Sequence, residues 1–374
     1  MLSIDRERGY HRPGRRRSAR ALRPIANGLR AAKRVVHGAS GSMATVRLEG
    51  SDFVSTEIRF AHLSDWHATS LVHPGFAAFR GKRLSGYASW AISRRRHHSP
   101  EILAAAMRDV RAQRVDRVLV TGDLTHISLP AEFAVARTQL ERLGSPEQVF
   151  LIPGNHDCYV PVPASESWDQ WAPFLRGLQP GEVDGELAAA LTPPPANECA
   201  PRHADFPTLR MGGPVAWIGL CSAIPTPIFR AGEQLGKVQL ERLRRLLVLL
   251  GARGMCRVLM IHHPVHPHGE PERRALSDGQ ALRDLLAEVG AELVVHGHKH
   301  RRRVDFLDVP GGRRIPAIGV PSSSEVGSRP DRRAQYHVYT ARPSSSGNGF
   351  DLAAEVRGYD AGTRAFVGLA DRLF

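Results

Sequence analysis

The chain has 374 residues, of which 42% are hydrophobic and 24% are charged. This is enough apolar material for one large domain or two small ones, and no run of about 18 apolar residues predicts a membrane-spanning helix. Its four cysteines have no spacing typical of a disulfide framework or a zinc site, so we expect a protein of the reducing cytoplasm without thiolate metal ligands.

A strongly basic segment opens the chain. Residues 1–42 contain eleven lysines and arginines but only two acidic residues, so they account for most of the net charge of +14. The segment has few apolar residues to bury and no hydrophobic stretch typical of a secretory signal. We therefore expect residues 1–50 to form a disordered N-terminal extension, and we prefer this interpretation to an arm that binds nucleic acid.

Short runs rich in valine, isoleucine and leucine alternate with helical patterns up to residue 300. The predicted strands cover residues 56–63, 115–121, 147–152, 215–221, 256–262 and 291–297. The predicted helices cover residues 99–113, 129–143, 239–254 and 277–290. Strands that alternate with helices predict an α/β fold with buried, largely parallel strands.

The last part of the chain has a different pattern. Strand-like runs at 301–309, 313–320, 334–341 and 350–360 are separated by glycine, proline and serine, which predicts antiparallel strands. Residues 160–213 and 322–333 are rich in the same turn-forming residues, and we expect loops there. We assign residues 55–374 to one domain.

Side chains that can bind metals follow the predicted strands. In chain order they are Asp65 and His67, Asp123, Asn155 with His156 and Asp157, His262 with His263, and His298 with His300. The carboxyl ends of strands in an α/β sheet meet at one crevice, so we expect these side chains to be neighbours. Oxygen and imidazole donors suit divalent zinc, manganese or iron, and there are too many of them for one tetrahedral ion. The sequence therefore predicts two divalent ions, a centre suited to phosphoryl transfer.

The ordered motifs DxH, GD, GNHD, HHP and GHxH resemble those of the calcineurin-like metallophosphoesterase superfamily, over residues 57–320. The resemblance implies a four-layer α/β/β/α sandwich with two mixed sheets. It also implies hydrolysis of a phosphodiester or pyrophosphate bond by a hydroxide that bridges two ions of manganese, iron or zinc.

The resemblance further implies a role for each residue. Asp65, His67 and His300 would bind the first metal, Asp123 would bridge, and Asn155, His262 and His298 would bind the second. His156 would donate a proton to the leaving oxygen or stabilise charge on the phosphoryl group, and Asp157 would orient the His156 imidazole or fix its protonation. The family pattern selects His262 rather than His263 as the ligand, and we expect His126 and His263 to be structural or to support the site without binding metal.

An insertion at 75–98 interleaves Phe76, Phe79, Tyr87 and Trp90 with Lys82 and with arginines that include Arg83. It is similar to a segment of bacterial enzymes that hydrolyse UDP-2,3-diacylglucosamine, which implies an amphiphilic, lipid-linked or other phosphorylated small-molecule substrate. Such a segment could also make a peripheral contact with the inner membrane surface. Alternatively, it is a helical cap whose rings pack on the fold and whose arginines are solvated.

Other functions remain as alternatives. A 3',5'-cyclic-nucleotide phosphodiesterase shares the five motifs and predicts a compact pocket with little use for the insertion. A nuclease would carry a long coiled-coil connection, which the sequence lacks, so we expect no nucleic-acid partner. A catalytically silent scaffold would have lost some ligands, and this chain retains all seven.

Overall fold

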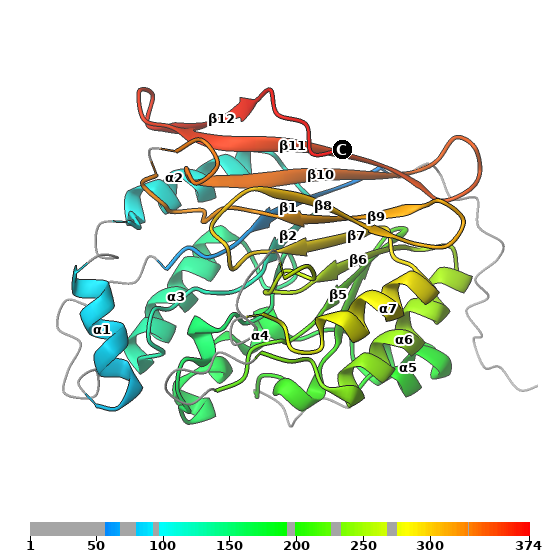
Figure 1. Cartoon of the computed structure of the whole chain (residues 1–374), viewed down its shortest axis with the longest axis horizontal. Coiled ribbons are helices and arrows are strands. Elements are labelled where there is room, and N and C mark those ends of the chain that lie inside the picture. The colour runs from blue at the N-terminus through cyan, green and yellow to red at the C-terminus, as the bar shows by residue number, and fades with distance from the viewer. Residues whose placement is uncertain are drawn as a thin grey trace, which may run out of the picture. The chain divides into compact units, whose positions relative to one another are not determined.

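A computed structural model of the chain describes residues 57–67, 80–92, 97–192, 199–225, 233–267, 275–327 and 329–374. The predicted extension over residues 1–50, and Phe76 and Phe79 of the insertion, lie outside these residues. Among the described elements, strands and helices largely alternate along the chain up to residue 296, and strands alone follow, as the hydrophobic pattern predicts (Figure 1). Within the described ranges, no helix combines the length and the apolar character needed to cross a bilayer.

The first sheet has the strand order β12-β11-β10-β1-β2-β3. Its strands are β1 (Ile58–Leu63), β2 (Arg117–Val120), β3 (Val149–Leu151), β10 (Gln335–Pro343), β11 (Phe350–Asp360) and β12 (Ala365–Leu369). β1, β2 and β3 are parallel, whereas β10, β11 and β12 add to β1 in antiparallel order. The sheet is therefore mixed, and the ends of β1, β2 and β3 open on the same edge.

The second sheet has the strand order β4-β5-β6-β7-β9-β8. Its strands are β4 (Thr208–Gly212), β5 (Val215–Gly219), β6 (Cys256–Met260), β7 (Leu293–His296), β8 (Arg303–Asp308) and β9 (Arg314–Gly319). β5, β6, β7 and β9 are parallel, and antiparallel strands β4 and β8 close the two edges. The prediction of antiparallel pairing after residue 300 is wrong for β9 beside β7, because the turn before β9 reverses the chain a second time.

Helices cover the outer faces of the two sheets. The helices are α1 (Lys82–Ile92), α2 (Pro100–Ala112), α3 (Pro130–Leu143), α4 (Ala172–Leu175), α5 (Gly185–Ala190), α6 (Lys237–Ala252) and α7 (Gly279–Val289). Helix α2 begins where the sequence predicts it, because the Ser99 side chain accepts a hydrogen bond from the Ile102 amide and Pro100 occupies the first helical turn. Figure 1 shows α6 and α7 beside β5, β6 and β7.

Alternating side chains of β5 separate two hydrophobic cores. Trp217 points between the sheets, where its ring meets Phe60 of β1 edge to face at 6.0 Å. Ala216 and Ile218 point the other way and pack with the leucines of α6 and α7. Both faces of this sheet are therefore buried, and the chain forms the predicted α/β/β/α sandwich.

Residues 160–213 contain more structure than the loops that the sequence predicts. They include α4, α5 and β4, together with Trp168 and Trp171, whose side chains are buried in the same hydrophobic core as Phe133 of α3. The indole of Trp171 donates to the Phe133 carbonyl of α3 at 2.9 Å. These elements are too short to give a periodic pattern, so tertiary packing rather than local sequence defines them.

Candidate metal centre

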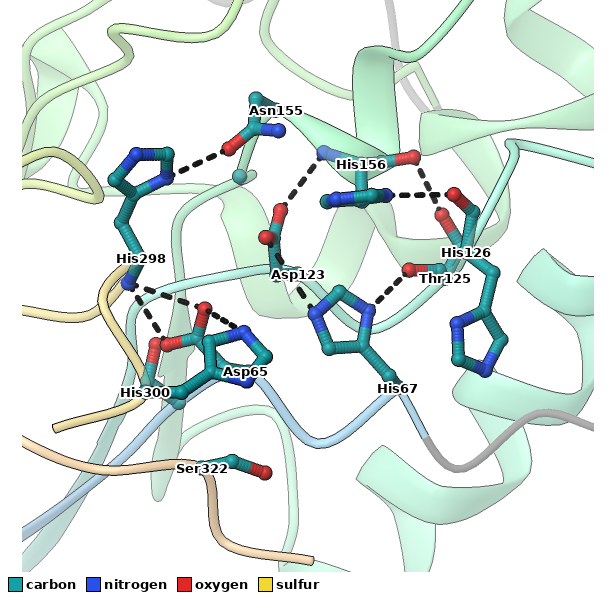
Figure 2. A network of polar contacts seen from close by, with 12 residues as sticks. Asp65, His67, Asp123, Thr125, His126, Asn155, His156, His298, His300 and Ser322 are labelled. Atoms are coloured by element: carbon teal, nitrogen blue, oxygen red, sulfur yellow. Dashed lines mark hydrogen bonds and ion pairs between the residues drawn. The ribbon is translucent and has the colours of Figure 1, made fainter. Parts of the chain in front are cut away.

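The ends of five parallel strands meet at one site. The loop after β1 supplies Asp65 and His67, the loop after β2 supplies Asp123, and the loop after β3 supplies Asn155 and His156. The second sheet supplies His262 after β6, and His298 and His300 after β7. Figure 2 shows Asp65, His67, Asp123, Asn155, His298 and His300 around a common centre. The fold thus brings together side chains that are up to 235 positions apart, as the sequence predicts.

The backbone is strained where these residues lie. Asp65, His67, Asp123, His298 and His300 all have φ between 35° and 68°, a left-handed conformation that is uncommon outside glycine. A Cβ atom at Gly154 would lie 2.3 Å from Asp123 Oδ1, and one at Gly297 would lie 2.2 Å from Asp65 Oδ2. Strain of this kind persists at sites whose side chains must converge on a ligand.

Asp65, His67, Asp123 and His300 form one group of candidate ligands, whose donor atoms all lie within 4.8 Å of one another. His300 Nε2 lies 3.3 Å from Asp65 Oδ1, and His67 Nε2 lies 3.6 Å from Asp123 Oδ2. The Nδ1 of His67 lies 2.7 Å from the Thr125 carbonyl oxygen. Because a carbonyl only accepts, Nδ1 carries the proton and Nε2 faces the group with a lone pair.

A second group gathers around the Asn155 side chain. Its Oδ1 lies 3.1 Å from His262 Nε2 and 3.0 Å from His298 Nδ1. Asp123 Oδ2 lies 3.3 Å from the same His262 nitrogen, so this one carboxylate contacts both groups. Asp123 therefore lies between the two groups.

These contacts shift the pKa values of the buried carboxyl and imidazole groups at the centre. Burial raises the pKa of the Asp123 carboxyl, but His262, His156 and His67 outweigh it and hold this pKa well below its ordinary value. In the metal-free protein, burial lowers the pKa of His262 and of His300. Asp123 and Asp65 nevertheless raise these two values, to about 10 and about 9. The metal-free centre therefore carries two imidazolium groups at neutral pH.

The structure corrects the role that we expected for Asp157. The imidazole Nδ1 of His156 lies 2.6 Å from the carbonyl oxygen of His126, so this carbonyl orients the ring. The Asp157 carboxylate instead accepts from the backbone amides of four residues at 2.8–3.0 Å: Asp123, Leu124, Thr125 and Gly154. Asp157 therefore joins the loops after β2 and β3, because its carboxylate accepts from backbone amides of both loops.

Sequence reasoning missed two acidic residues beside the centre. Glu233 is 1% exposed, and its Oε2 lies 3.4 Å from His263 Nε2, whose Nδ1 lies 2.8 Å from Ser222 Oγ. Glu325 Oε2 lies 3.5 Å from His300 Nδ1. No motif spacing marks either residue, because each reaches the site from a loop with no strand-end signal of its own.

The described part of the insertion packs on the site loops. Trp90 of α1 is 6% exposed and packs against Ile127 and Leu129, and Arg83 donates to the carbonyls of Ile127 and Ser128. The alternative interpretation of a helical cap therefore describes Trp90, whereas Arg83 binds backbone carbonyls and is not solvated as that interpretation expects. Lys82, in contrast, lies 4.4 Å above the ring of Tyr159, which stacks on His156 at 5.7 Å.

The donor set fits a pair of divalent cations. Carboxylate, amide and imidazole donors are the ligands that zinc, manganese and iron share in proteins. The buried Nε2 of His67 has no hydrogen-bond partner, which would be costly without a ligand at the centre.

The sequence profile described as calcineurin-like phosphoesterase matches residues 58–302. The chain therefore belongs to the calcineurin-like phosphoesterase family, and it is a metal-dependent phosphoric ester hydrolase of a family that uses a dimetal centre. No curated protein matches the chain in sequence.

Solved structures resemble the chain only distantly. A dimetal phosphatase from Danio rerio is 11% identical with a TM-score of 0.49, over 79% of this chain and 98% of its own. The phosphoesterase YfkN from Bacillus subtilis is 12% identical with a TM-score of 0.41, over 85% of this chain and 93% of its own. The NAD nucleotidase of Haemophilus influenzae is 11% identical with a TM-score of 0.42, over 85% of this chain and 54% of its own. These likenesses add nothing about the substrate.

Metal binding is expected to release protons. At pH 7.5 the imidazolium groups of His262 and His300 must lose a proton before they can bind a metal, because their pKa values are raised to about 10 and about 9. The apparent affinity should rise by about tenfold per pH unit for each of these groups below its pKa, and level off above it. Calorimetry of zinc binding in buffers of different ionisation enthalpy measures the number of protons released. We expect this number to approach two when two zinc ions bind. Zinc binding without proton release at pH 7.5 would contradict the assignment of these two ligands.

Proposed function

We propose that Asp65, His67 and His300 hold a first divalent ion and that Asn155, His262 and His298 hold a second. Asp123 would contact both ions. The observation that carries the proposal is the position of Asp123 Oδ2, which lies 3.6 Å from His67 Nε2 and 3.3 Å from His262 Nε2, one histidine of each set. The ions are manganese, iron or zinc, which oxygen and imidazole donors suit.

When bound, such an ion pair lowers the pKa of water and neutralises charge on a phosphoryl group. His156 stands at the side of the centre with its Nδ1 hydrogen-bonded to the His126 carbonyl oxygen. This contact fixes the ring, and in the imidazolium form Nε2 can give a proton to the departing oxygen. Asp157 keeps the loops after β2 and β3 together through its four backbone contacts.

We propose a phosphodiester or pyrophosphate substrate. Lys82 supports this, because its ammonium group lies 4.4 Å above the ring of Tyr159, and that ring stacks on His156. A cation on the leaving-group side stabilises a departing group that is itself a phosphate. This favours a pyrophosphate, such as a UDP-sugar, over a cyclic nucleotide, whose leaving group is a single alkoxide.

The lipid portion of the proposed substrate has weaker support than its pyrophosphate. Trp90 and Arg83 hold α1 against the loop that follows β2, so they contribute to packing rather than to an exposed amphiphilic surface. Replacing them would test the docking of α1 and not a contact with an acyl chain. A comparison of substrates with and without acyl chains is the direct test.

A hydrolysis panel tests the proposal. Manganese-loaded protein would be given UDP-2,3-diacylglucosamine, UDP-glucose, cyclic AMP, p-nitrophenyl phosphate and bis(p-nitrophenyl) phosphate. We expect a pyrophosphate to be the best substrate, and Lys82→Ala to lower kcat/KM for it about tenfold, the effect of one charge-assisted contact. The change should be small for bis(p-nitrophenyl) phosphate, because nitrophenolate stabilises its own charge.

Arg80 provides the control for Lys82. It lies two positions before Lys82 and is exposed, so Arg80→Ala should leave all rates unchanged. A preference for cyclic AMP that Lys82→Ala does not alter would select the cyclic-nucleotide alternative. Equal rates on UDP-glucose and its diacylated relative would exclude recognition of a lipid chain.

A further inference from the structure

The insertion delivers one more histidine to the centre. Residues 97–99 run antiparallel to residues 324–326, with His98 opposite Glu325. Two backbone hydrogen bonds hold this bridge: Ser99 N donates to Ser324 O at 2.9 Å, and Val326 N donates to His97 O at 2.8 Å. The same bridge thus fixes both His98 and the carboxylate that contacts His300.

The ring of His98 lies beside two candidate ligands of the first ion. Its centroid is 5.0 Å from that of His67 and 5.5 Å from that of His300. One ring nitrogen from each of the three histidines lies within 4.8 Å of the other two. Nitrogen ligands at about 2.1 Å from one ion are separated by at most about 4 Å, so a small closure of this group would let all three bind the same ion.

Hydrogen bonding sets the tautomer of His98. Ser324 Oγ donates its one proton to the Trp66 carbonyl oxygen. This hydroxyl can therefore only accept from His98 Nδ1, which lies 2.9 Å away. Nδ1 carries the proton, and in the neutral ring Nε2 has the lone pair.

The same arrangement marks two histidines already assigned to the ions. His67 Nδ1 lies 2.7 Å from Thr125 O, and His262 Nδ1 lies 2.6 Å from Thr121 O. In each case an oxygen acceptor takes the Nδ1 proton and leaves Nε2 as the ligand atom, which is how proteins orient metal-binding imidazoles.

We propose that His98 is an additional imidazole ligand of the first ion, supplied by the insertion. The inference rests on the proposed function, since it requires an ion held by Asp65, His67, Asp123 and His300. It gives the insertion a role at the centre that the five motifs do not contain. A third nitrogen donor shifts the preference of this site toward zinc, cobalt and iron and away from manganese.

A cobalt titration of metal-free protein tests the proposal. Wild-type protein should bind two ions in two resolved steps. Calorimetry and the visible absorption of Co²⁺ monitor these steps. His98→Ala should weaken one step by at least about tenfold, change the absorption of that ion, and leave the other step unaltered. Ser324→Ala should weaken the same step by a smaller factor, because it removes the closer hydroxyl at His98 Nδ1 and leaves Ser322 Oγ, at 3.3 Å, beside the same nitrogen.

His97→Ala is the matched control. His97 is exposed, and the bridge uses its backbone carbonyl, so this variant should bind both ions like the wild type. If His98→Ala fails to fold, as judged by circular dichroism, His98→Gln preserves side-chain volume without a ring nitrogen. Two ions bound with unchanged affinity and spectrum in the His98 variant would overturn the proposal. Wild-type protein that binds fewer than two ions would instead overturn the proposed dimetal function.

Discussion

Asp123→Asn is expected to abolish metal binding and catalysis together. The Asp123 carboxylate contacts His67 and His262, which belong to different ligand sets, at 3.6 and 3.3 Å. An amide at this position removes the negative charge that both ions would share and places an N–H group toward ring nitrogens. Loss of transition-state stabilisation of several kcal/mol corresponds to a decrease in kcat/KM of about a thousandfold or more. Metal content after dialysis and hydrolysis of bis(p-nitrophenyl) phosphate measure the two effects.

Asp351→Asn provides the control for this variant, because Asp351 is exposed on β11. It should retain two ions and full activity. If Asp123→Asn instead kept one ion at wild-type affinity, Asp123 would serve a single metal and the proposed bridging role would be wrong. Circular dichroism establishes that both variants are folded.

His156→Ala is expected to retain both ions while losing turnover. The backbone amide of His156 donates to Asp123 Oδ1 at 2.8 Å, and alanine keeps this bond. The variant loses only the imidazole that the His126 carbonyl oxygen orients. Removal of a general acid lowers kcat by about 10² to 10⁴, and metal analysis beside steady-state kinetics separates turnover from metal loss.

The leaving group provides an internal control for His156. A substrate with a good leaving group, such as bis(p-nitrophenyl) phosphate, needs less proton donation than an alkyl phosphodiester, so the variant should lose less activity on it. His203→Ala, outside the centre, should behave as the wild type. An empty centre in His156→Ala would mean that His156 supports metal binding, and our division of roles would be wrong.

The hydrophobic pattern and the motifs determine much of this fold and site. Runs such as those of β1, β2 and β6 bury both faces, which requires helices outside and parallel neighbours inside. The polar residues that follow these runs must then collect at one edge, because parallel strands end on the same side. The convergence of Asp65, Asp123 and His262 at one edge could therefore be predicted from the sequence.

Contacts between loops that are distant in the sequence could not be predicted from the hydrophobic pattern or the motifs. The sequence places Asp157 beside His156, but only the folded turn shows that Asp157 faces backbone amides while the His126 carbonyl holds the ring. Nothing in the spacing of His98 marks it, since its place depends on the bridge to Glu325, 227 positions later. Strand-end positions follow from a local pattern that repeats along the chain, whereas these contacts depend on how loops of different strands pack, and tertiary packing alone decides that.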